Sequence, residues 1–180
     1  MFSLLLQWET NKPGSLLRLD TARGLLMRAA WRAYTQGNYG KQWHVSPDDL
    51  WELTKTNFPF LEGKRAEFFS SLEGIPLLEY DGEKGRYFLD PRFAEFLVAR
   101  YQIMTVTGGD KKLCEEIFFT TAPYYDVVRY RYMGLKCLDA GQQEQYLASM
   151  LRFFEDFWQE WLKTGSPEAE LSLCRILQPT

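Results

Sequence analysis

Residues 46–90 are predicted to form a helix, a turn, a second helix and a hairpin, and this order constrains the fold more than any other feature of the chain. Ser46 suits a helix cap and Pro47 the first helical position, because a capping oxygen accepts a hydrogen bond from a free amide and proline has no amide to leave unpaired. The segment Asn57-Phe58-Pro59 should end this helix, since the residue before a proline avoids the helical region. We therefore expect a helix from Pro47 to about Asn57.

A second helix and a hairpin follow. The helix fits residues 63–73, and Gly74 suits its C-terminal end. Two apolar runs come next, at residues 75–80 and 86–89, with Asp81-Gly82-Glu83-Lys84-Gly85 between them. Because aspartate and glycine tolerate the positive φ of tight turns, this pattern predicts a two-stranded β-hairpin.

Together with a helix expected to end at Gln36, these elements resemble a winged helix-turn-helix over about residues 20–100. The resemblance is to an architecture shared by many families, and no motif in the chain selects one of them. It implies that the second helix of the pair enters a DNA major groove with its N-terminal residues leading, while the hairpin contacts the backbone.

The remainder of the chain is expected to be helical, so the fold class is mainly α. Asp90-Pro91 restarts a helix, and Thr107-Gly108-Gly109-Asp110 is the clearest later break. We place the domain boundary at that break, with a winged-helix-like module at residues 1–107 and a C-terminal helical bundle at 108–180. Its helices are expected from Asp110 to about Thr121, from Pro123 to near Gly141, at residues 142–163 and at residues 168–177. Residues 2–8 are expected to form a short strand or an extended arm.

The charge balance is uneven along the chain. Its 180 residues carry 21 basic and 24 acidic side chains, a formal net charge of −3. Proteins that hold DNA through its phosphates are usually basic, so the total counts against nucleic-acid binding. However, residues 11–44 carry six basic side chains and one acidic one. A local positive face on an acidic protein can still steer a polyanion.

Seven residues are candidates for contacting double-stranded DNA. The second helix of the pair offers side chains for the groove, and the first helix and the hairpin offer cations for phosphates. Glu62, Glu67 and Glu73 share the second helix and oppose this function, so a solvated scaffold surface is an equally good interpretation. The candidates are Lys64, Arg65 and Ser70 on the second helix, Arg28 and Arg32 on the first, and Lys84 and Arg86 on the hairpin.

The last long helix carries an apolar stripe that is wider than packing on one neighbour requires. Aromatic residues favour protein interfaces, so the surplus indicates contact with a partner protein or with a second copy of the chain. The candidate interface residues are Phe153, Phe157, Trp158 and Trp161.

Several classes of chemistry have no support in the sequence. His44 is the only histidine, and its position before a helix cap favours packing over catalysis. Cys114, Cys137 and Cys174 match no metal or redox spacing, and we expect them to be buried, reduced thiols of a cytoplasmic protein. We find no phosphate-binding loop, dinucleotide fingerprint or nucleophile motif. We therefore expect no enzyme activity, no metal and no cofactor.

Two functions remain. The leading hypothesis is a non-catalytic DNA-binding protein, acting as a regulator or as a component of a DNA-processing assembly. The alternative is a protein–protein interaction adaptor that uses the same architecture as a scaffold and its aromatic helix as the interface. The apolar runs are too short for a membrane span, and the start of the chain has no basic lead for a signal peptide, so we expect no membrane partner.

Overall fold

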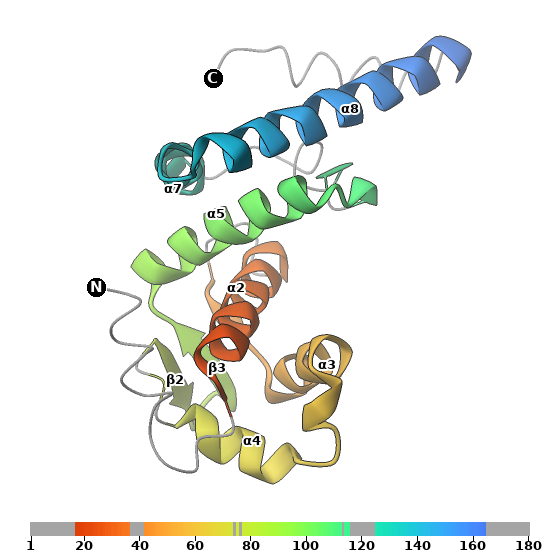
Figure 1. The fold of residues 1–180 in the computed structure, drawn as a ribbon. Coiled ribbons are helices and arrows are strands. Elements are labelled where there is room, and N and C mark those ends of the chain that lie inside the picture. Colours follow the sequence, from red (N-terminus) through yellow and green to blue (C-terminus); the bar gives the residue numbers. More distant parts are fainter. Residues whose placement is uncertain are drawn as a thin grey trace. The chain divides into compact units, whose positions relative to one another are not determined.

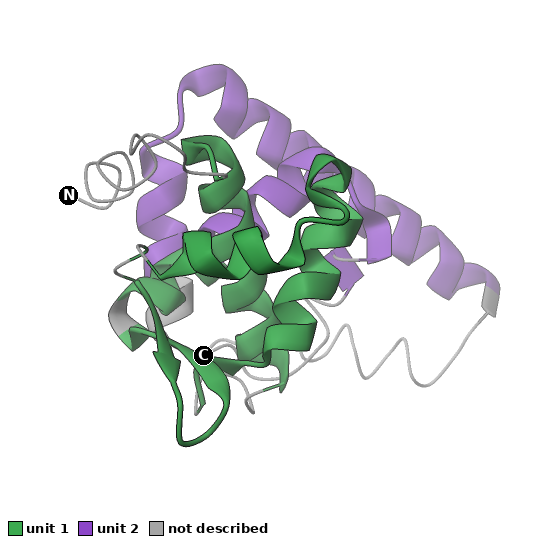
Figure 2. Cartoon of the chain, turned by 90° about the horizontal axis from the view of Figure 1, so that it is seen from below, with its two compact units in different colours: residues 1–98 green, residues 99–180 purple. Residues whose placement is uncertain are grey.

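The computed structural model describes residues 17–36, 42–73, 75, 77–112, 114–115 and 125–164. Cys174 and the elements expected at residues 2–8 and 168–177 lie outside this part. The chain divides into two compact units, unit 1 at residues 1–98 and unit 2 at residues 99–180 (Figure 2). The division falls within helix α5 (Pro91–Gly108), whereas the sequence placed the boundary at the end of that helix.

The expectation of a mainly helical class is confirmed (Figure 1). Besides the helices, the described residues form one small antiparallel sheet. Among the described residues, no helix combines the length and apolar character needed to cross a membrane.

Unit 1 contains the helices predicted around residues 20–73, with small shifts in their bounds. They are α2 (Leu19–Gln36), α3 (Pro47–Asn57), the 3-10 turn η1 (Pro59–Leu61) and α4 (Arg65–Leu72). Ser46 caps α3 as expected, because its Oγ accepts a hydrogen bond from the Asp49 amide at 3.0 Å. The helix ends before Pro59, where the Phe58 amide donates to the Thr54 carbonyl.

The sheet has one strand more than the sequence predicted. Strands β2 (Leu78–Asp81) and β3 (Arg86–Leu89) form the expected hairpin, and β1 (His44–Val45) joins its other side. The order is β1-β3-β2, all antiparallel, with His44 opposite Phe88. At the hairpin tip Asp81 Oδ1 accepts hydrogen bonds from the amides of Glu83 and Lys84, at 3.1 and 3.2 Å, which fixes the turn.

Unit 1 has a closed apolar core. The apolar residues of α2 at spacings of three and four are fully buried, and α4 adds Phe68 and Leu72. Helix α2 contacts both α3 and β1, so the core lies between the helices and the small sheet. Residues of α2, α3, η1, α4, β1 and β3 that are at most 1% exposed include Ala22, Leu25, Leu26, Ala29, Ala30, Ala33, Val45, Leu50, Leu61, Phe68, Leu72 and Leu89.

Unit 2 contains the second half of α5 together with α7 (Tyr125–Lys136) and α8 (Ala140–Thr164). Helix α5 ends at the predicted glycine break, where Gly109 has a positive φ of 72°. Asp139 caps α8 by accepting a hydrogen bond from the Gln142 amide at 2.8 Å. Residues 111–112 and 114–115 are helical, while most of the helix expected to follow Asp110 lies outside the described residues. The core of unit 2 is a cluster of Ile103, Val106, Cys114, Tyr146 and Phe153.

Cys137, Ala66 and Met104 are exposed apolar residues, and one of them, Cys137, was expected to be buried. Cys137 follows the last residue of α7 and lies in a turn, so it has no helix face to pack on. Ala66 lies in the first turn of the short helix α4, where only Phe68 and Leu72 are buried. Met104 is 52% exposed on α5, although its neighbour Ile103 is buried in the unit 2 core.

Candidate functional site

The first predicted contacts, Lys64 and Arg65, stand at the exposed start of α4. The Nη2 atom of Arg65 lies 2.6 Å from Asp48 Oδ1, and its guanidinium lies over the Phe69 ring at 5.7 Å. Both partners of this ion pair are more than half exposed, so the pair contributes at most about 1 kcal/mol to stability. Lys64 and Ser70 are exposed, and neither side chain bonds to any other described residue.

A second arginine, Arg32 of α2, also contacts the first turn of α3. Arg32 Nε lies 3.8 Å from Asp49 Oδ1, and the same carboxylate accepts the Ser46 hydroxyl through Oδ2 at 2.7 Å. The two aspartates at the start of α3 therefore each hold an arginine, Asp48 from α4 and Asp49 from α2. Carboxylates are favourable at this helix end because the amide dipoles make it positive.

The hairpin provides two further cations. Lys84 Nζ lies 3.1 Å from Asp81 Oδ2. Its hydrogen bonds to that carboxylate, from the side chain and from the backbone amide, lower the pKa of Asp81 below its usual 3.8. Arg86 is exposed at the start of β3, and among the described residues its side chain has no ion-pair partner.

A polar hollow of about 170 Å³ connects Arg86 with the first turn of α3. A neighbouring hollow links Arg86 to Lys84, with Gln42 and His44 in both linings. The His44 ring packs on Phe88 at 5.5 Å, as its predicted packing role implies. Its Nδ1 atom, however, is buried without a hydrogen-bond partner in the described part of the chain. The first hollow is lined by Gln36, Gln42, His44, Ser46, Asp49 and Arg86.

Arg28 is separate from this group. It is half-buried, its Nη1 donates a hydrogen bond to the Gly24 carbonyl at 3.1 Å, and its guanidinium lies over Phe58 at 5.8 Å. Phe58 follows the last residue of α3, at the opposite end of that helix from Asp48 and Asp49. The geometry gives Arg28 a packing function between α2 and the end of α3.

Arg32 and Arg65 thus pair with the two aspartates in the first turn of α3, and Arg86 lines a hollow with one of them. Lys84 lies farther along the hairpin and shares a second hollow with Arg86. We call these four residues the cation cluster. The sequence did not indicate the polar residues between them, Gln36, Gln42 and His44. No local pattern could have found these residues, because the hollow forms only when β1 pairs with β3 and brings Gln42 and His44 beside Arg86.

The predicted interface on α8 is divided between core and surface. Phe153 is only 5% exposed and belongs to the unit 2 core, so it cannot serve as a surface contact. Phe157 and Trp161 are half-buried, while Trp158 is 44% exposed and its ring centroid lies 4.8 Å from that of Trp161. Three further residues of the same apolar pattern are exposed: Leu147, Leu151 and Leu162, at 58%, 69% and 56%.

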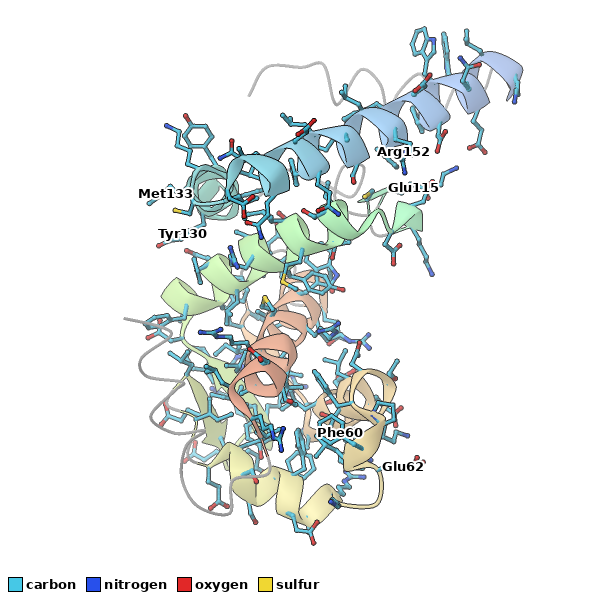
Figure 3. All side chains as sticks on the ribbon, in the orientation of Figure 1. Phe60, Glu62, Glu115, Tyr130, Met133 and Arg152 are labelled. Atoms are coloured by element: carbon cyan, nitrogen blue, oxygen red, sulfur yellow. The ribbon has the colours of Figure 1, made fainter. Side chains whose placement is uncertain are left out.

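Figure 3 labels exposed residues of both units. Phe60 and Glu62 lie between α3 and α4 in unit 1, and Met133 and Arg152 lie on α7 and α8 in unit 2. Within the described residues, no three histidine, cysteine, aspartate or glutamate side chains lie where they could hold one metal ion. The interpretation of the site therefore depends on the cation cluster and on the exposed face of α8.

In comparisons with protein-family models, with curated proteins and with solved structures, nothing matches this chain.

Proposed function

We propose that unit 1 is a winged helix-turn-helix that binds duplex DNA and catalyses no reaction, either as a regulator or as part of a DNA-processing assembly. The element order α2-β1-α3-α4-β2-β3 supports this architecture, with α4 as the helix that enters the major groove. The sheet order β1-β3-β2 also supports it, because the hairpin expected as the wing is present, with residues 82–86 exposed at its tip.

The observation that carries the proposal is the cation cluster. Its members come from α2, α4 and the hairpin, elements far apart in the sequence, yet three of them lie beside the first turn of α3, and the fourth, Lys84, shares a hollow with Arg86. Lys64, Arg65 and Ser70 would lead into the groove, while Arg32, Lys84 and Arg86 would contact phosphates. An arginine can bind a phosphate through two parallel charge-assisted hydrogen bonds. The exposed pairs with the aspartates contribute at most about 1 kcal/mol each, so a phosphate can replace them.

The two aspartates reduce the affinity expected for DNA. Asp48 and Asp49 lie among the cations, so they repel phosphates and occupy Arg65 and Arg32 in the free protein. We therefore expect a weak to moderate complex with a strong dependence on salt. The three phosphate contacts proposed for Arg32, Lys84 and Arg86 correspond to a slope of about −3 in log K against log salt concentration.

The test is a fluorescence-anisotropy titration of a labelled duplex at several salt concentrations. The Lys64→Ala/Arg65→Ala variant should bind about tenfold more weakly or worse, since it loses two leading contacts. Lys55→Ala is the matched control, because Lys55 lies near the other end of α3 and pairs with Glu52. Asp48→Asn should bind more tightly than wild type, since it removes a repelling charge and releases Arg65.

Absence of binding at low salt would refute the proposal. Equal affinities for wild type and the Lys64→Ala/Arg65→Ala variant would also refute it, even if the duplex binds elsewhere on the chain. Circular dichroism of each variant confirms that a lost affinity is not a lost fold.

A second candidate function is a protein–protein interaction adaptor, favoured by the exposed apolar residues of α8. In this case the cluster serves only ion pairs within unit 1, and DNA affinity is absent. A pull-down with immobilised wild-type protein tests this function, and the same pull-down with the Leu151→Glu variant is its control. A partner that is lost with this variant, and that binds wild type again as a purified protein, would support the adaptor.

A further inference from the structure

Four large apolar residues form a narrow exposed stripe along α8: Leu147, Leu151, Trp158 and Leu162. Their successive spacings are four, seven and four residues. At about 100° of rotation per residue these positions fall within about 60° of the helix circumference. We call this set the α8 stripe, and it spans about 22 Å of helix at 1.5 Å per residue.

The α8 stripe is separate from the face of α8 that packs in unit 2. Tyr146 and Phe153 are 5% exposed, and Met150 packs against the same cluster. These positions are centred about 120° away from the stripe on the helix. The unit 2 core therefore uses one apolar face of α8 and leaves a second one exposed.

The spacing of the α8 stripe is the same when read in either direction. Its midpoint lies between Phe154 and Glu155, so reversal places position 147 on position 162 and position 151 on position 158. A helix with this symmetry matches itself in an antiparallel pair, which is what a two-fold dimer interface requires. A different partner protein would have no reason to select such a symmetric spacing.

We propose that α8 pairs in antiparallel orientation with α8 of a second copy of this chain, through the α8 stripe. Leu147 then meets Leu162 of the other copy, and Leu151 meets Trp158 of the other copy. Both contacts occur twice, since the two-fold axis repeats them. This inference does not depend on DNA binding, because all its residues lie in unit 2.

The area is sufficient for a reversible dimer. Each of the four side chains exposes on the order of 100 Å², so two copies bury roughly 800–1,000 Å² from these residues alone. The side chains that border the stripe bring the total to about the lower bound for specific interfaces, 1,200 Å². We therefore expect an equilibrium between monomer and dimer rather than a permanent assembly.

The charged residues beside the stripe provide a test of the antiparallel arrangement that leaves its apolar residues unchanged. Near the midpoint, Glu155 of one copy lies close to Glu155 of the other, and Arg152 of each copy lies close enough to offset this repulsion. Arg152 is exposed on α8 and has no ion-pair partner among the described residues (Figure 3). Arg152→Glu should therefore weaken the dimer by at least tenfold, although it alters no apolar residue.

Sedimentation velocity over a range of protein concentrations tests the dimer. Wild type should shift from monomer to dimer, and Leu151→Glu should raise the dissociation constant at least thirtyfold. Met133→Glu is the matched control, because Met133 is 50% exposed but lies on α7, outside the stripe. Wild type that stays monomeric at about 100 μM would overturn the proposal, as would a Leu151→Glu variant that dimerises like wild type.

Disulfide crosslinking tests the orientation, with Cys137→Ser and Cys174→Ser as background. Leu147→Cys and Leu162→Cys variants should each fail to crosslink alone and should form a covalent dimer when mixed under mild oxidation. Crosslinking of either variant with itself, and no gain on mixing, would overturn the antiparallel pairing. The buried Cys114 stays in place, since burial raises the pKa of its thiol and disfavours the reactive thiolate.

Discussion

The two units differ in how completely they bury their large apolar side chains. In the described part of the chain, all leucine and phenylalanine side chains that are less than 2% exposed belong to unit 1, from Leu17 to Leu97. Most of the large apolar side chains that are exposed belong to unit 2, and four of them form the α8 stripe. Unit 1 therefore completes its own core, whereas unit 2 is built with one face left over. That difference is why we propose ligand binding through charge for unit 1 and association through apolar contact for unit 2.

The largest expected effect comes from the closed core of unit 1. Phe68 is fully buried and contacts the Trp51 ring at 5.6 Å, so Phe68→Ala leaves a cavity and should cost about 3–5 kcal/mol in the free energy of unfolding. Phe60→Ala is the control, because Phe60 is 61% exposed and its loss should cost less than about 1 kcal/mol (Figure 3). Denaturant unfolding followed by tryptophan fluorescence measures both. Similar costs for the two phenylalanines would contradict the closed core.

A smaller effect on the free energy of unfolding is expected in unit 2, where truncation of one residue of α8 should destabilise the fold and truncation of another should not. Phe153→Ala removes a core residue and should cost about 2–4 kcal/mol, with faster amide exchange in α5, α7 and α8. Leu151→Ala should change monomer stability by about 0.5 kcal/mol or less, since its side chain is 69% exposed. Hydrogen exchange with mass spectrometry, at a concentration where wild type is monomeric, separates the two. Strong destabilisation by Leu151→Ala would mean that the stripe is covered within the same chain.

The smallest effect concerns the hairpin tip and its pH dependence. The hydrogen bonds from Lys84 lower the pKa of Asp81, so the ionised carboxylate stabilises the turn. This contribution is complete above pH 3.8 and is lost as the pH falls through the lowered pKa of the folded state. An NMR titration of the Lys84 amide should show this transition below pH 3.8, and Lys84→Ala should move it upward. A transition at or above the usual value in wild type would contradict the hydrogen bond.

Local signals in the sequence predicted the local elements well. The Ser46 cap, the break before Pro59, the hairpin turn and the start of α5 at Pro91 are each specified by a few adjacent residues, and the structure has all of them. The strand β1 was missed because two residues show no alternation, and it exists only by pairing with residues more than forty positions later.

The candidate site was only partly predictable for the same reason. Charge counts indicated which segments carry cations, but the pairing of Arg65 with Asp48 and of Arg32 with Asp49 depends on how the helices pack. On α8 the width of the apolar pattern was visible, yet both faces share the helical period. The sequence therefore could not assign Phe153 to the core and Leu151 to the surface.

The aspartates at the start of α3 already occupy Arg32 and Arg65, so they compete with any approaching anion for these arginines. A ligand must displace Asp48 from Arg65 and Asp49 from Arg32, so anions of low charge gain little there. Under the proposed function, a polyanion would engage several cations at once and replace both carboxylates in a single encounter. The two aspartates would then favour densely charged ligands without recognition of a particular sequence.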